Sequence, residues 1–275
     1  MFSASELGQL ALLGATLIGA GVVAGVLSGL LGVGGGIVVV PVLNFGFSYL
    51  GVDPSVRQHV AVATSLATVA VTAARSARLH HARGAVDTQL LSSWGPAIVT
   101  GSVLGTSLAA ALGGRALTGV FGGVALLVAL HMGFGRESWR IADAPPSGPA
   151  RLPIAGAVGF VSVMMGLGGG TVGVPTLTLL GVPMHRAVGT AAGLGSAIAV
   201  PGAIGLALAG IGVPGRPPGC SGYLNVIGFA LITPTTWLAA PLGARFAHAI
   251  SPRALRRGFA FFLALVSLRM LLDVR

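Results

Sequence analysis

The chain has 275 residues, of which 54% are hydrophobic and only 8% are charged, and its mean hydropathy is +0.91. A soluble domain carries about 25% charged residues because water must wet its surface. This composition therefore excludes an ordinary soluble protein and indicates a chain surrounded by lipid. The formal net charge is +10, and all 16 basic residues are arginine. They lie mostly at the ends of apolar runs, as in loops beside a membrane, which argues against nucleic acid as a partner.

Apolar runs follow one another along the chain and predict its helices. They cover about 8–33, 36–51, 58–74, 88–113, 116–135, 152–167, 171–183, 187–212, 222–248 and 257–272. A helix needs roughly 20 residues to cross about 30 Å of hydrocarbon, and three of these runs, 36–51, 152–167 and 171–183, are shorter than that. The sequence thus predicts an all-α, polytopic integral membrane protein.

The two halves of the chain repeat one another. Residues 25–43 match 159–177 at a constant offset of 134, and residues 96–132 match 234–270 at an offset of 138. A shorter block between them pairs His59 and Thr64 with His185 and Thr190. We therefore predict three parts, listed in chain order: a first membrane repeat at 1–135, a linker at 136–151 and a second membrane repeat at 152–275.

The charges of the loops predict how the repeats are oriented. The first half has a strongly basic segment at 75–83 and then only Arg115, whereas the second half has only Arg216 and then a basic segment at 245–257. Placing both basic segments in the cytoplasm requires inverted repeats, a cytoplasmic linker and both chain ends outside. Inverted repeats are common in secondary transporters, so we expect a multi-pass protein of a bacterial inner (plasma) membrane.

The first two runs of each half leave an alternative open. They are either two full crossings or two short helices that meet at glycines as a re-entrant hairpin. The shortness of 152–167 and 171–183 favours glycine-broken or re-entrant helices near the midplane.

The glycine clusters at 34–36 and 168–170 are the main candidates for a substrate site. Each is followed five residues later by a proline. Glycine can adopt backbone angles that are closed to other residues, and a helix that restarts at such a cluster aims unpaired N–H groups at an anion. The alternative is that these glycines only allow helices to pack closely.

Polar side chains near the glycines extend this candidate site. Hydroxyl groups in an apolar helix line a polar path or bond to their own backbone, and a histidine and arginine at a helix entrance attract anions or mark the membrane interface. The predicted substrate-binding residues are Gly34, Gly35, Gly36, Pro41, Thr64, Ser65, Gly168, Gly169, Gly170, Thr171, Pro175, His185, Arg186 and Thr190.

The acidic residues limit the chemistry of the substrate. All six lie at the ends of runs, in loops or near the termini: Glu6, Asp53, Asp87, Glu137, Asp143 and Asp273. Cation pumps and carboxylate proton relays place such residues inside the membrane, so we expect an anionic or neutral substrate. We find no metal-ligand cluster or nucleophile motif, and we predict no enzyme activity, catalytic residue, metal or cofactor.

At the glycine clusters the chain resembles the TauE/SafE type of sulfite exporter. The likeness is carried by the segments GLLGVGGGIVVVPVL (29–43) and GLGGGTVGVPTLTLLGVP (166–183), and it extends through 186–193, 101–109 and 254–272. It implies export or uptake of small sulfur-containing anions such as sulfite, sulfoacetate or other sulfonates, and it allows for coupling to a proton gradient. Because the first half departs from the His/Arg-Ala-Val-Gly-Thr pattern that 185–190 keeps, the second-half residues are the stronger site prediction.

The sequence predicts a secondary transporter that moves a small anion, sulfite or an organosulfonate, across the inner membrane. Two alternatives stay open: a permease for another small solute such as an organic acid, and a membrane assembly or sensor component that transports nothing. The expected partners are the small anion and the lipid bilayer. The oligomeric state, the direction of transport and the coupling ion stay open.

Overall fold

The computed structural model describes residues 4–31, 35–134, 140–246 and 252–274. Over these residues the regular secondary structure is helical apart from one short antiparallel hairpin. Its elements are α1 (Ala4–Leu31), α2 (Gly36–Tyr49), α3 (Pro54–Ala82), α4 (Thr88–Ala111), α5 (Gly114–Phe134), a 3-10 turn η1 (Gly148–Ala150), α6 (Arg151–Met164), α7 (Gly169–Leu179), α8 (Met184–Ala209), β1 (Cys220–Ser221), β2 (Leu224–Asn225), α9 (Val226–Phe246) and α10 (Pro252–Leu272).

The all-α membrane fold predicted from composition is confirmed. Four helical stretches within the described residues are long and apolar enough to cross a bilayer: Pro54–Ala82, Gly114–Phe134, Met184–Ala209 and Val226–Gly243. Helix α3 is longer than the apolar run suggested, because no helix breaker follows the run until Gly84, which has a positive φ of 67°. Arg75 and Arg78 therefore lie on the last turns of a helix and not in a loop.

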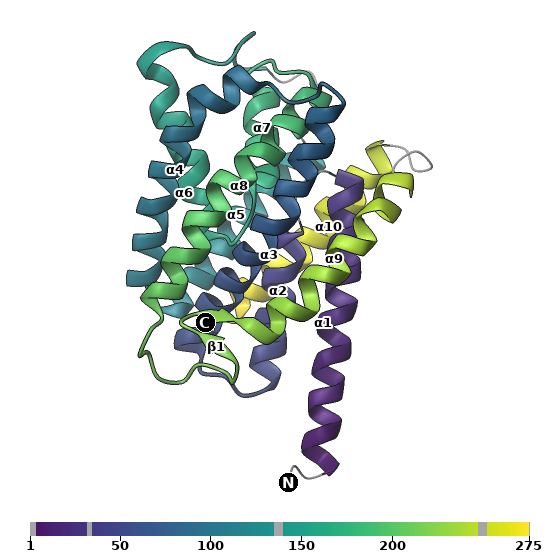
Figure 1. Ribbon diagram of the computed structural model, residues 1–275, viewed down its shortest axis with the longest axis vertical. Coiled ribbons are helices and arrows are strands. Elements are labelled where there is room, and N and C mark those ends of the chain that lie inside the picture. Colours follow the sequence, from purple (N-terminus) through teal and green to yellow (C-terminus); the bar gives the residue numbers. More distant parts are fainter. Residues whose placement is uncertain (1–3, 32–34, 135–139, 247–251, 275) are drawn as a thin grey trace.

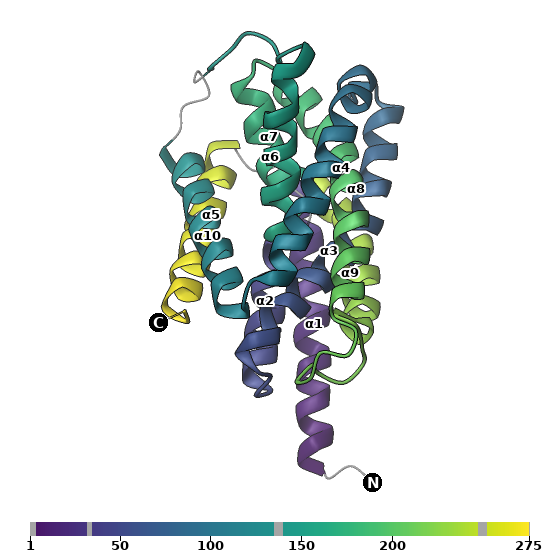
Figure 2. The same cartoon turned by 90° about the vertical axis from the view of Figure 1, so that its left-hand side faces the viewer.

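The helices run between two ends of the bundle (Figures 1 and 2). We call the upper end of Figure 1, where α3 ends and α4, α6 and α8 begin, the basic end. The lower end, where α1 begins and α10 ends, is called the terminal end. The start of α1 and the end of α10 thus lie toward the same end of the bundle.

Helices α2, α6 and α7 are short, and the chain reverses direction at α1–α2 and at α6–α7, from opposite ends of the bundle (Figure 2). Helix α2 turns back toward the terminal end, from which α1 enters, whereas α6 and α7 enter from and return to the basic end. Helix α7 has 11 residues and α2 has 14, so at 1.5 Å per residue α7 is about 16 Å long. That is about half of the hydrocarbon thickness, and with the 14 residues of α6 it favours a re-entrant hairpin for α6–α7. Helix α1 has 28 residues and is long enough to cross.

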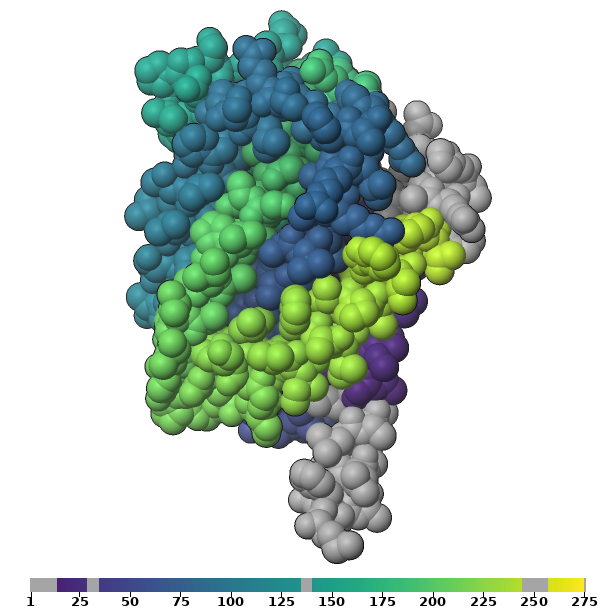
Figure 3. All heavy atoms as spheres, viewed as in Figure 1, coloured from purple at the N-terminus to yellow at the C-terminus, as the bar shows by residue number. Residues whose placement is uncertain are grey.

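The helices pair across the two halves of the chain. Helix α1 packs along α9, and its sequence counterpart α6 packs along α4, the counterpart of α9. Helices α3 and α8, which are counterparts, pack on one another, as do α5 and α10. Figure 3 shows α8, α3 and α9 side by side on one face of the molecule.

Individual backbone contacts repeat as well. A Cβ on Gly25 would lie 2.5 Å from the Thr236 carbonyl oxygen, and a Cβ on Gly159 would lie 2.2 Å from the Ile98 carbonyl oxygen. Gly159 is the counterpart of Gly25 at the offset of 134, and Thr236 is the counterpart of Ile98 at the offset of 138. Close approach through glycine is how membrane helices gain packing energy without a hydrophobic force between them. The duplication read from the sequence is therefore reflected in matching contacts, and the opposite orientation of the repeats in the membrane stays a prediction.

We predict that residues at the basic end all lie on one side of the membrane. In a Cys220→Ser background, Arg83→Cys and Arg257→Cys should both resist an impermeant thiol reagent applied outside cells, because positively charged loops are retained in the cytoplasm. Arg115→Cys, at the terminal end, is the matched control and should react. Labelling of only one of positions 83 and 257 from outside would contradict the inverted repeats.

Candidate functional site

The start of α7 is built by the turn that follows α6. Gly166 has a positive φ of 69°, which a residue with a side chain rarely adopts, and the chain then passes through Gly168 in an extended conformation. No side chain caps the first turn of α7. The first N–H groups of a helix have no partner within the helix, so this turn presents backbone donors near the middle of the bundle.

A small cavity of about 20 Å³ lies beside this helix start. Its wall combines the predicted glycines 168–170 with residues of three other helices: Ser28 of α1, Val69, Thr72, Ala73 and Ser76 of α3, and Ala191, Ala192 and Gly195 of α8. None of the described residues that line it carries a charge. The cavity therefore offers neutral donors only, namely hydroxyl groups and backbone N–H groups.

The second glycine cluster also allows close packing, which was the alternative reading of these residues. A Cβ on Gly169 would lie 2.3 Å from the Ala191 carbonyl oxygen, and a Cβ on Gly168 would lie 2.7 Å from Val69 Cγ1. Neither glycine has a positive φ, so close approach, and not an unusual backbone angle, is what requires glycine here. Packing and cavity lining are combined in the same residues.

The first glycine cluster meets the α6–α7 turn and is tightly packed. Gly34 lies outside the described residues, Gly35 precedes α2, and Gly36 begins that helix. A Cβ on Gly36 would lie 2.7 Å from the Gly166 carbonyl oxygen and 3.0 Å from Ser65 Oγ. The Ser65 hydroxyl donates to that same carbonyl at 2.7 Å. The start of α2 thus lies against the turn that precedes α7, and the space between them is filled by the Ser65 side chain.

Three more predicted residues lie within the short helices. Pro41 and Pro175 are inside α2 and α7, one turn or more beyond the glycines. Thr171 is buried in the first turn of α7. None of the three contributes to the wall of the cavity.

The two predicted threonines are held by backbone groups. Thr190 Oγ1 accepts a hydrogen bond from the Asp87 N–H at 2.9 Å, and Thr64 Oγ1 accepts one from the Asn225 N–H at 3.0 Å. Both threonines are fully buried. Their hydroxyl groups join helices of opposite halves and do not line the cavity.

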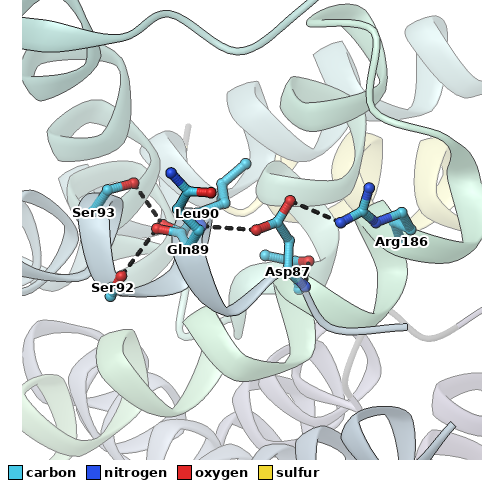
Figure 4. Close-up of polar contacts among 7 residues, drawn as sticks. Asp87, Gln89, Leu90, Ser92, Ser93 and Arg186 are labelled. Carbon is cyan, nitrogen blue, oxygen red and sulfur yellow. Dashed lines mark hydrogen bonds and ion pairs between the residues drawn. The ribbon is translucent and has the colours of Figure 1, made fainter. Parts of the chain in front are cut away.

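The predicted residues His185 and Arg186, at the start of α8, are exposed at the basic end. The Arg186 Nη2 group donates to Asp87 Oδ2 at 3.1 Å, while Asp87 Oδ1 accepts from the Leu90 N–H at 2.9 Å and caps α4 (Figure 4). His185 is exposed beside Arg186. Neither residue lies in the cavity wall.

The comparisons with known proteins agree with this architecture. The profile of a family described as "Sulfite exporter TauE/SafE" matches residues 17–270. The chain belongs to the TauE/SafE family. A "probable membrane transporter protein" of Haemophilus influenzae is 29% identical over 92% of this chain and 96% of its own length. A protein of the same description from Methanocaldococcus jannaschii is 28% identical over 93% of this chain and 94% of its own. No solved structure matches the chain significantly.

Membership in the TauE/SafE family confirms a multi-pass inner-membrane transporter and not an enzyme. It does not identify the residues that bind substrate.

Two groups of residues in this TauE/SafE protein were missed by sequence reasoning. Ser28, Thr72 and Ser76 join the cavity wall although they lie far in sequence from glycines 168–170. Asp87 and Asn225 both precede helices and are held by the threonines. The second pair carried a signal, because 87 and 225 are separated by the offset of 138 that relates other residues of the two halves.

We predict that α7 tolerates a methyl group at one glycine and not at another. Gly169→Ala should lower the free energy of unfolding by about 1–3 kcal/mol, since its Cβ would meet backbone atoms of α8. Gly173→Ala is the matched control, because its Cβ would meet its nearest neighbour at 3.6 Å, an ordinary contact distance. Thermal melting of the purified variants in detergent measures both effects, and equal melting temperatures would contradict the close packing described for Gly169.

Proposed function

We propose that this TauE/SafE protein transports a small oxyanion, sulfite or an organosulfonate, and binds it in the cavity beside the start of α7. The observation that carries the proposal is that Gly168, Gly169 and Gly170 line the same cavity as three residues with hydroxyl groups, Ser28, Thr72 and Ser76. An oxyanion with several equivalent oxygen atoms can accept hydrogen bonds from such donors on more than one side.

The electrostatics of the cavity favour an anion that must also be released. The start of a helix has the effect of roughly half a positive charge, and the lining residues add no full charge. A buried ion pair in a medium of low dielectric constant is held strongly. Neutral donors and a partial charge attract the anion more weakly, which suits a site that binds and releases its substrate in each cycle.

The size of the cavity implies that the helices around it separate during transport. A volume of about 20 Å³ exceeds only slightly the roughly 10–15 Å³ that a single water molecule needs on this measure. A sulfonate group is larger than a water molecule. The structure therefore corresponds to a closed form of the proposed site.

The same electrostatics predict that the substrate carries a single negative charge. The cost of taking an ion out of water rises steeply with its charge, and the cavity has no cationic side chain to offset a second charge. In proteoliposomes we expect uptake of hydrogen sulfite and methanesulfonate but not of the dianion sulfate. Acetate tests the organic-acid alternative and sodium ions serve as a negative control. Flux of acetate alone would replace the proposed substrate, and flux of none of these ions would contradict the proposed substrate class.

We predict that the hydroxyl of Ser76 contributes directly to anion binding. Ser76→Ala should weaken the affinity for hydrogen sulfite about tenfold or more, since a hydrogen bond to a charged group contributes about 1.5–3 kcal/mol. Ser107→Ala is the control, because Ser107 is exposed and donates to Val103 of its own helix. Anion-dependent thermal stabilisation of the purified protein measures the affinity, and unchanged stabilisation of Ser76→Ala would contradict the proposed site.

A further inference from the structure

We propose that two matching hydrogen bonds between the repeats act as gates that control access to the central cavity from the two ends. The basic-end tether is the bond from the Asp87 N–H to Thr190 Oγ1, and the terminal-end tether is the bond from the Asn225 N–H to Thr64 Oγ1. The proposal concerns access to the site and rests on the proposed function for what passes through.

The two tethers have the same construction. In each, one residue caps its own helix and is held by a buried threonine of the opposite half. Asp87 Oδ1 accepts from the Leu90 N–H at 2.9 Å, and Asn225 Oδ1 accepts from the Gly228 N–H at 2.7 Å, in both cases three residues further on. A capping residue whose own N–H is bonded elsewhere couples the position of its helix to that partner.

The residues of one tether are the counterparts, in the other half of the chain, of the residues of the other tether. Asp87 and Asn225 are separated by 138 residues, and Thr64 and Thr190 by 126, the spacing of the matching block that contains them. Thr64 of the first half holds α9 of the second, while Thr190 of the second half holds α4 of the first. Each tether therefore joins the two repeats at one end of the bundle.

The basic-end tether lies next to the wall of the cavity. Thr190 directly precedes Ala191 and Ala192, which line the cavity. One residue earlier, a Cβ on Gly189 would lie 2.4 Å from the Ala85 carbonyl oxygen, so the loop before α4 presses on the same turn of α8. Releasing Asp87 from Thr190 frees this turn of α8 to move, and that movement widens the cavity toward the basic end.

The terminal-end side is packed shut in this structure. Ser28 lines the cavity, whereas its counterpart Ser162, at the offset of 134, is fully buried and its Oγ has no hydrogen-bond partner among the residues that the structure describes. An unpaired buried hydroxyl is costly and gains partners when that side opens. The two sides are thus in different states, which is what alternate release of the two tethers produces.

The tethers differ in charge. Asp87 also pairs with Arg186, and their side chains are 26% and 47% exposed. Asn225 is neutral, and its Nδ2 donates to the Pro218 carbonyl at 3.0 Å. Salt screens an exposed ion pair, so ionic strength should act on the basic-end tether and not on the other.

The test uses cysteine reporters in membrane vesicles of both orientations, in a Cys220→Ser background. Ser76→Cys reports access from the basic end and Ser162→Cys reports access from the terminal end. Thr190→Val should raise the labelling rate of the first reporter by about fivefold, the equilibrium change expected for one lost hydrogen bond, and leave the second unchanged. Thr64→Val should do the reverse.

Three controls separate a gate from a general loss of stability. Thr118→Val removes a buried hydroxyl that bonds only within its own helix and should change neither reporter. Thr190→Ser and Thr64→Ser keep the hydroxyl and should label as the parent does. High salt should speed labelling of Ser76→Cys alone, and Asp87→Asn, which copies Asn225, should remove that salt effect.

Equal changes in both reporters, or no change in either, would overturn the gates. If the reporters label as expected but vesicles of the Cys220→Ser parent, in which Ser76 and Ser162 are intact, show no flux of hydrogen sulfite or methanesulfonate, the proposed function is refuted and the gates stand. Flux without selective labelling would support the proposed function and refute the gates.

Discussion

A backbone group inside lipid has no water to bond with, so every interruption of a helix needs a partner from elsewhere in the chain. Pro241 lacks the N–H that would bond the Trp237 carbonyl, and Arg75 donates to that carbonyl at 2.8 Å while its guanidinium stacks 3.8 Å above the Trp237 ring. The Ser65 hydroxyl likewise donates to the Gly166 carbonyl, in the turn between α6 and α7. This requirement explains most of the polar side chains within the bundle. It also explains the tethers, in which a threonine hydroxyl accepts from a backbone N–H at a helix start.

Glycine gives the bundle both its packing and its cavity. Where α1 meets α9 and α6 meets α4, glycines let a helix approach the carbonyl groups of its neighbour. At the start of α7 the same lack of a side chain leaves backbone groups uncovered beside Ser76 and Thr72. A residue that packs closely on one side and lines a cavity on the other is sensitive to substitution for two reasons, and only a binding measurement separates them.

Charge is kept at the ends of the helices. Asp53 and Asp87 cap α3 and α4 with their side chains, and the Ser55 N–H that bonds Asp53 keeps the pKa of that carboxyl below its ordinary value. Capping places a negative charge at a helix start, where the helix dipole stabilises it. The wall of the central cavity is left to neutral donors, which is the property on which the proposed anion site depends.

Hydropathy and the internal repeat were sufficient to predict an all-α membrane protein, the bounds of most helices within about five residues, and which residues of the two halves correspond, because these depend on local composition and on duplication. The end of α3 was the exception. The predicted glycines 168–170 do line a cavity, but Ser28, Thr72 and Ser76 join them only because α1 and α3 fold against α7. Thr64 and Thr190 were predicted as polar lining, yet the fold assigns their hydroxyls to helix starts in the opposite repeat. Periodicity and composition describe which residues a segment contains and which face of a helix is apolar. They do not describe which distant backbone N–H a buried hydroxyl will meet, since that partner is set by how the two halves pack.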